Sequence, residues 1–167
     1  MIHYGILTIF PALMALAAMS DLVTMTISNK LSLALVASFT VLAIACGVDL
    51  QQLGLNYLAG FLVLVISFGL FYAGWIGGGD AKLAAATAVW MGFANLGDYL
   101  LYSSLLGGAL TLAMLAMRQY PWPNMVATIP WIARLYQLDK GIPYGIALAF
   151  AGLIQYPSTI IWQFSTQ

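Results

Sequence analysis

Glutamate is missing from this sequence of 167 residues, and all five of its acidic residues are aspartates. Charged residues of both signs make up only 6% of the chain, against about a quarter in a typical soluble domain. So few charges cannot cover a water-facing surface, which excludes an ordinary soluble protein. The five lysines and arginines balance the five aspartates, so no excess of positive charge indicates a nucleic-acid partner.

Cysteine and histidine are also scarce, since the sequence contains one residue of each. Cys46 stands alone in an apolar run, and a single thiol can form neither an internal disulfide nor a paired-cysteine metal site. We therefore expect no metal and no cofactor, and we interpret Cys46 as a small buried apolar residue. No Lys or Arg precedes the first apolar stretch, which favours a retained helix over a cleaved signal peptide.

Long apolar runs are what the chain does have, since 63% of its residues are hydrophobic. These runs are continuous, whereas the strands of a membrane barrel alternate apolar and polar residues, so we expect an all-α integral membrane protein. A span needs about 20 mainly apolar residues, which predicts about six transmembrane helices in a single domain over residues 1–167. The expected spans are 4–21, 31–47, 54–74, 81–96, 99–117 and 143–163. The fourth is short and rich in alanine, which favours a helix packed among others.

All five cations fall in alternate connections of this layout, and therefore on one side of the membrane. They are Lys30, Lys82, Arg118, Arg134 and Lys140. The positive-inside rule makes that side cytoplasmic and places both termini outside the cytoplasm. Asp49 and Asp98 occupy the opposite connections, and Asp139 lies beside Lys140 in the longest polar connection, where we expect it to be solvated.

Asp21 and Asp80 differ from the other acids because each lies at the cytoplasmic edge of an apolar span. An ionisable residue at that depth is costly and indicates function. Two facing carboxylates in a low-dielectric site share one proton, since both cannot ionise cheaply. The charged member can then take a proton from water that attacks a peptide carbonyl, while the protonated member polarises the carbonyl oxygen. This chemistry is that of an aspartic peptidase.

Three glycines, Gly77, Gly78 and Gly79, run directly into Asp80 in the stretch WIGGGDAKL. Glycine allows close backbone approach and unusual conformations, so we expect this run to interrupt a helix and to present Asp80 from irregular backbone. The competing interpretation is a flexible turn whose aspartate caps the next helix. Lys82 follows, and two roles stay open for it: it tunes the charge of the site, or it extends to the lipid headgroups.

Two stretches together resemble the bacterial prepilin peptidases, which are membrane aspartic peptidases of the GxGD type. SDLVTMTISNKL at residues 20–31 matches the family's first motif through Asp21 and Asn29, with Ser28 where the family usually has proline. The second motif, Gly-x-Gly-Asp-x-Lys, is matched in full at residues 77–82. GIPYGIALAFAG at residues 141–152 looks like the opening of the family's last helix.

The resemblance implies a GxGD-type intramembrane aspartic protease architecture in which Asp21 and Asp80 are the catalytic pair. Gly77, Gly78, Gly79, Lys82 and Asn29 would support them. Larger members carry an N-terminal cytoplasmic domain with paired cysteines that methylates the product. This chain looks like the short, peptidase-only form that accompanies Flp pili in tight-adherence secretion, so no S-adenosylmethionine use is implied.

By the same likeness, the substrate is a Flp-type pilin or pseudopilin precursor, cleaved at the cytoplasmic face of the bacterial inner membrane. Membrane lipid is the other expected partner. The segment 118–142 contains prolines at 121 and 123 and is expected to form an interfacial helix or to help bind the prepilin leader.

Two other classes of function stay open. One is a noncatalytic membrane component, either an assembly scaffold or a transporter, and the other is a GxGD protease with a different substrate. Transport is disfavoured because no ionisable residue lies near the middle of an expected span.

Overall fold

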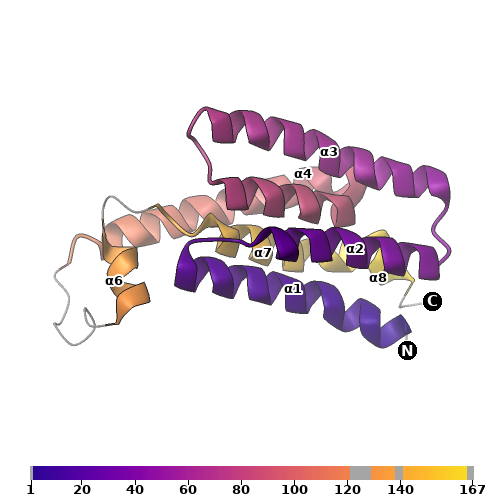
Figure 1. Cartoon of the computed structure of the whole chain (residues 1–167), viewed down its shortest axis with the longest axis horizontal. Helices are drawn as coiled ribbons and strands as arrows, with labels where there is room; N and C mark the ends of the chain where they lie inside the picture. Colours follow the sequence, from indigo (N-terminus) through magenta and orange to yellow (C-terminus); the bar gives the residue numbers. More distant parts are fainter. Residues whose placement is uncertain (1, 121–128, 138–140, 165–167) are drawn as a thin grey trace.

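The computed structural model describes residues 2–120, 129–137 and 141–164. Within those ranges the chain is all-α, as expected, and contains no strand. The helices are α1 (Ile2–Thr24), α2 (Asn29–Ala45), α3 (Leu50–Tyr72), α4 (Gly78–Met117), α6 (Pro130–Tyr136), α7 (Tyr144–Gln155), the 3₁₀ turn η1 (Tyr156–Ser158) and α8 (Ile160–Gln163). Figure 1 shows them as an elongated bundle with most helix axes along its length.

Three of the described helices are long and apolar enough to cross a membrane: most of α1, α3 and α4. The 17 residues of α2 form a shorter apolar helix. These helices support a membrane protein, and the count of six spans remains a prediction. The expected boundaries of the first three spans agree with α1, α2 and α3 to within a few residues.

The expected connection between the fourth and fifth spans, at residues 97 and 98, is wrong, because Gly97 and Asp98 lie inside α4. The break falls earlier, at Gly92, whose φ of 59° and ψ of 179° are not helical. After it the second arm of α4 returns toward the end of the bundle where α6 lies (Figure 1). One apolar segment therefore supplies two antiparallel helical arms.

A buried amide stabilises this reversal. Asn56 of α3 donates from Nδ2 to the carbonyl oxygen of Val89 at 2.8 Å, and its Oδ1 accepts from Gln52 at 2.8 Å. A non-helical residue at position 92 interrupts the i to i−4 hydrogen bonds around it, and a freed carbonyl in an apolar interior needs another donor. Asn56, which is 1% exposed, supplies that donor.

The first arm of α4 is the central element of the bundle, as its alanine-rich sequence predicts. From Ala81 to Gly92 every residue except Lys82 is buried. The arm packs against α3, α2 and α7. Gly60 of α3 faces Val89 and the carbonyl of Ala85 so closely that a Cβ would clash, which is the small-residue packing common between membrane helices.

An aromatic cluster holds α1, α2 and α4 to the C-terminal elements. Phe10 stacks on Tyr156 with ring centroids 4.5 Å apart and lies 4.7 Å from the ring of Trp90. The indole Nε1 of Trp90 donates to the carbonyl oxygen of Leu35 at 2.9 Å, so this buried polar atom is satisfied.

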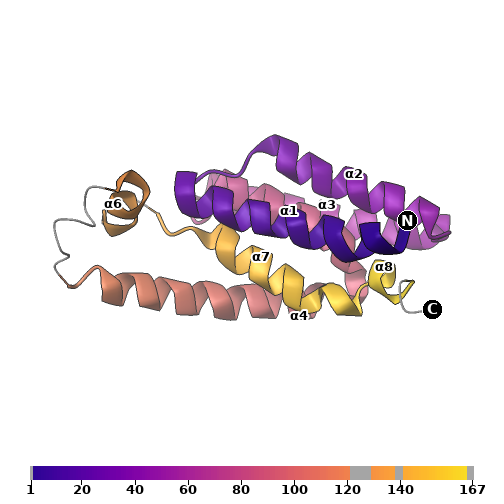
Figure 2. The same ribbon diagram turned by 90° about the horizontal axis from the view of Figure 1, so that it is seen from below.

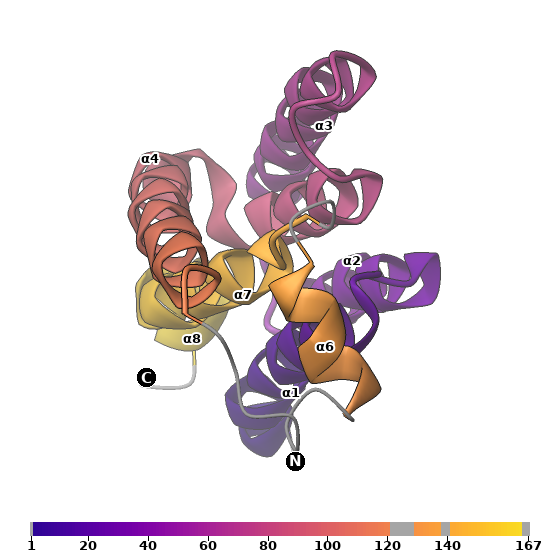
Figure 3. The ribbon, with the colours of Figure 1, turned by 90° about the vertical axis from the view of Figure 1, so that its left-hand side faces the viewer.

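The two ends of the bundle differ in what they carry. Both termini lie at one end, and α6 lies at the other, beyond the end of α1 (Figure 2). Figure 3 views the molecule from the α6 end, with α6 in front of the helix ends. Helix α2 begins shortly after Asp21, and α4 begins just before Asp80. Both helix starts lie at the α6 end of the bundle, which is where the candidate site lies.

Candidate functional site

Asp21 lies one turn before the end of α1 and is only 5% exposed. The helix ends at Thr24, and Met25 adopts a left-handed φ of 55° while its amide donates to the carbonyl oxygen of Asp21 at 2.8 Å. This is the αL form of helix termination, in which the chain turns sharply after its last helical residue. The turn keeps Asp21 in regular helix and directs residues 25–28 past its side chain.

Ser28 has a role that the comparison with the family's proline did not predict. It is the N-cap of α2, and its side chain accepts a hydrogen bond from the Leu31 amide at 3.3 Å. A serine at this position satisfies one of the free amides at the start of the helix, which a proline ring cannot do. The chain therefore begins α2 with a side-chain cap in place of a rigid turn residue.

Asp80 lies in the first turn of α4 and is half-buried. Its carboxylate folds back over the start of its own helix, since a Cβ on Gly77 would lie 2.9 Å from Asp80 Oδ2. The N-cap of α4 is Gly77 and no side-chain cap hydrogen bond is made there, so Asp80 lies inside the first turn and is not the cap residue.

The glycines act through close approach, and the expected irregular backbone at Asp80 is wrong. Helix α4 begins at Gly78, and none of Gly77, Gly78 and Gly79 has a positive φ. A Cβ on Gly79 would lie 3.3 Å from the amide nitrogen of Ile27, and one on Gly78 would lie 3.2 Å from the ring of Phe71. The run therefore lets the start of α4 pack directly on the turn that follows Asp21.

The structure brings Asp21 and Asp80 together, as the sequence predicts. Both carboxylates line a cavity of about 750 Å³, whose other walls include the 24–26 turn, the 74–77 connection and the start of α7. Both also line an adjoining cavity of about 310 Å³ against the glycine run. A third, mainly apolar cavity of about 350 Å³ between α4 and α7 also touches Asp80.

Gly145 is a site residue that sequence reasoning missed. Its amide, in the first turn of α7, donates to Asp21 Oδ2 at 2.7 Å. A Cβ here would lie 2.7 Å from that same Asp21 oxygen. The free amides at a helix N-terminus favour a carboxylate, so α7 orients Asp21 while its glycine leaves room for this side chain. The available signal was the glycine two residues after Pro143 in the stretch GIPYGIALAFAG.

Lys82 and Asn29 contact each other outside the two cavities that are lined by both aspartates. Lys82 Nζ donates to Asn29 Oδ1 at 2.8 Å and so joins the start of α4 to the start of α2. Neither residue lines a cavity that contains both aspartates. Any support that they give the site is therefore positional, because they join the Asn29 end of the first motif to the second motif at the start of α4.

Arg134 is the second residue that the sequence did not single out. It lies in α6, donates from Nη1 to the carbonyl oxygen of Val23 at 3.2 Å and lines the larger cavity with both aspartates. Among the described residues of segment 118–142 lies α6, whose place at the membrane interface stays a prediction, and the prolines at 121 and 123, Asp139 and Lys140 lie outside the described residues.

In the described part of the chain, no three His, Cys or acidic side chains gather as they would around a metal ion. What the site offers is a pair of carboxylates, backbone amides and a guanidinium at the margin of a cavity large enough for a short peptide segment.

Comparisons with known proteins bear on this geometry. No curated protein and no solved structure matches the chain. Residues 8–112 match the type IV leader peptidase family, and this range covers more than half of the chain and contains both motifs with Asp21 and Asp80. The chain therefore belongs to the type IV leader peptidase family.

Proposed function

We propose that this protein is an aspartic prepilin peptidase whose catalytic pair is Asp21 and Asp80. The observation that carries the proposal is that both carboxylates line one cavity, in which the Gly145 amide holds Asp21 in place. The chain's membership of a leader peptidase family supplies the class of reaction, and the two carboxylates supply a mechanism.

The pair holds one proton between two oxygens. The ionised carboxylate takes a proton from a water molecule, whose oxygen then forms a bond to the carbonyl carbon of the scissile peptide. The protonated carboxyl donates its proton to the carbonyl oxygen, which gives a neutral tetrahedral diol. Collapse of the diol breaks the C–N bond, the leaving nitrogen takes up a proton, and the products are a carboxyl terminus and a free amine.

The cavities fit a substrate that is polar on one side of the cleaved bond and apolar on the other. The larger cavity opens between α6 and the ends of α1 and α7, whereas the cavity between α4 and α7 has mainly apolar walls. Asp80 lines both, so a chain that crosses from one to the other passes the carboxylates. A Flp-type prepilin, with a charged leader followed by an apolar helix, has this order, and we propose it as the substrate.

We also propose that the site faces the cytoplasm from the inner membrane, within a layout of six spans. The helix ends that carry Lys30, Lys82, Arg118 and Arg134 all belong to the end of the bundle that holds the site. The positive-inside rule assigns this end to the cytoplasm, where a prepilin leader resides.

The first experiment is a cleavage assay in membranes with a co-expressed Flp-type prepilin. Wild type is compared with Asp21→Asn and Asp80→Asn, because asparagine keeps the size of the side chain but cannot exchange the proton. We expect both variants to reach the membrane and to lose processing. Asp98→Asn is the matched control, since Asp98 is exposed on the second arm of α4 and should leave cleavage unchanged.

Processing by either active-site variant at the wild-type rate would exclude the aspartyl mechanism. A wild-type protein that cleaves none of several prepilins, while remaining folded in the membrane, would favour a noncatalytic scaffold. Cleavage of a membrane substrate other than a prepilin would favour a GxGD protease of different specificity.

A further inference from the structure

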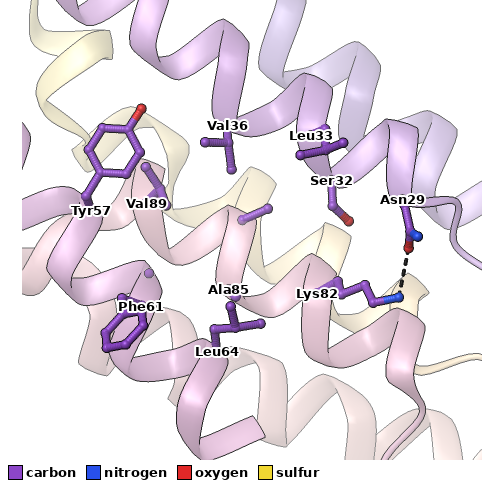
Figure 4. Close-up of a pocket in the computed structure, with 12 residues that line it drawn as sticks. Asn29, Ser32, Leu33, Val36, Tyr57, Phe61, Leu64, Lys82, Ala85 and Val89 are labelled. Carbon is purple, nitrogen blue, oxygen red and sulfur yellow. Dashed lines mark hydrogen bonds between the residues drawn. The ribbon is translucent and has the colours of Figure 1, made fainter. Parts of the chain in front are cut away.

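A groove between α2, α3 and α4 lies apart from the cavities that contain both aspartates (Figure 4). Its volume is about 470 Å³, and most of its wall is apolar, with Val36, Tyr57, Phe61 and Leu64 along it. Phe61 and Leu64 are exposed in the isolated chain, so the groove opens toward what would be the lipid phase. Its size and lining are those of a binding site for an apolar chain.

One end of the groove is polar. Lys82, Asn29 and Ser32 lie there, with the ammonium of Lys82 bonded to Asn29 (Figure 4). Within the part of the chain that the structure describes, no carboxylate pairs with Lys82, and two of its three N–H donors are unused. Ser32 Oγ is buried without a hydrogen-bond partner among the same residues. A cation and a free hydroxyl at the end of an apolar groove are complementary to an anionic oxygen group attached to a hydrocarbon tail.

We propose that the groove binds a phospholipid of the bilayer, with its phosphate at Lys82, Asn29 and Ser32 and one acyl chain between α2 and α3. Depth supports this orientation, because Lys82 lies in the first turns of α4 at the cation-rich end of the bundle, where headgroups are found. The bound lipid would tie the starts of α2 and α4 together, which carry the Asn29 end of the first motif and the second motif.

Binding is measured by native mass spectrometry on the delipidated full-length protein in detergent. Phosphatidylglycerol is titrated against phosphatidylcholine with the same acyl chains, because only the first carries net negative charge. We expect wild type to prefer phosphatidylglycerol by about five-fold, which is the order expected for one cation at a membrane surface. Lys82→Gln should lose the preference, and Lys82→Arg should keep it.

Lys30→Gln is the matched control, since Lys30 lies beside Asn29 in sequence and is exposed, yet it does not line the groove. It should bind both lipids as wild type does. Val36→Phe fills the apolar part and should weaken the binding of both lipids while leaving the charge in place. Every variant is first checked for a monodisperse elution profile.

Four results would overturn the proposal. Equal binding of the two lipids by wild type would remove the role of charge. A loss in Lys30→Gln as large as that in Lys82→Gln would indicate diffuse surface attraction. Unchanged binding by Val36→Phe, or occupation of the groove by an apolar helical peptide that the lipid cannot displace, would assign the groove to another ligand. None of these binding measurements depends on Asp21 or Asp80. The lipid proposal is therefore tested separately from the peptidase mechanism.

Discussion

At the scale of single residues, the geometry of the site depends on a glycine, Gly145, because a side chain at its position would collide with Asp21. Gly145 has no Cβ, and the space where one would stand lies 2.7 Å from Asp21 Oδ2 and 2.7 Å from Cδ1 of Ile27. An oxygen and a methyl group cannot both give way without moving the carboxylate or the 25–28 turn. Glycine at this position is therefore a requirement of the observed geometry around Asp21, and helix formation alone does not explain it, since alanine is the better helix former.

Gly145→Ala should slow prepilin cleavage by about 10- to 100-fold, because a displacement of about 1 Å in a catalytic group has effects of that size. The variant should still fold, since alanine suits the first turn of α7. Cleavage is followed in membranes against Gly108→Ala, an identical substitution at an exposed helical glycine with open space around it. Wild-type rates in Gly145→Ala would show that the Gly145 contact does not position Asp21.

At the scale of the element, α4 shows how one apolar segment is divided. The reversal lies at a glycine whose φ and ψ belong almost to glycine alone, and its backbone faces the side chain of Asn56. The arm before it carries Asp80 and is buried on nearly every side, whereas the arm after it is largely exposed. The position of the break thus decides which part of the segment enters the core.

Gly92→Ala should destabilise the fold by about 1–3 kcal/mol, the usual cost of a side chain held in such a backbone conformation. A Cβ at this position would also lie 3.0 Å from both terminal atoms of the Asn56 amide. Gly97→Ala is the control, because Gly97 lies in regular helix with nothing within 4 Å, and alanine should there be neutral or stabilising by about 0.5–1 kcal/mol.

The measurement is the midpoint of thermal unfolding in detergent for the two variants and wild type. We expect a lower midpoint for Gly92→Ala and an equal or higher one for Gly97→Ala. Equal midpoints for Gly92→Ala and wild type would mean that the reversal does not need the glycine conformation.

At the scale of the whole molecule, the sequence predicts the class of fold and the pairing of Asp21 with Asp80. Hydrophobic runs and the placement of cations suffice for the class of fold and for the similar depth of the two aspartates, because the bilayer restricts the chain to helices and sets the depth of each helix end. Their pairing is implied by the likeness of the two motifs to those of the prepilin peptidases. The sequence does not predict the break at Gly92, which depends on Asn56, a residue 36 positions away in another helix. It equally misses Gly145 and Arg134, whose roles arise from the docking of α7 and α6 beside α1.

The topology itself can be tested with the chain's single cysteine removed. In a Cys46→Ala background, a cysteine is introduced at Gln51, which is exposed in the first turn of α3, or at Tyr120, which is 71% exposed just after α4. If α1, α2, α3 and both arms of α4 cross the membrane, these two positions lie on opposite sides, with Tyr120 on the side of Asp21 and Asp80. A membrane-impermeant maleimide should then label Gln51→Cys in intact spheroplasts and Tyr120→Cys only in inverted vesicles.

Each alternative arrangement gives a different labelling pattern. If α4 crossed as one helix, only four crossings would separate the N-terminus from Tyr120, and the two cysteines would be labelled from the same side. If the layout were correct but inverted, Tyr120→Cys would be labelled in spheroplasts, and the aspartates would face away from a cytoplasmic prepilin leader. Labelling as expected would instead place Asp21, Asp80 and Arg134 where a leader peptide arrives, because Arg134 bonds to the end of α1 and lines their common cavity.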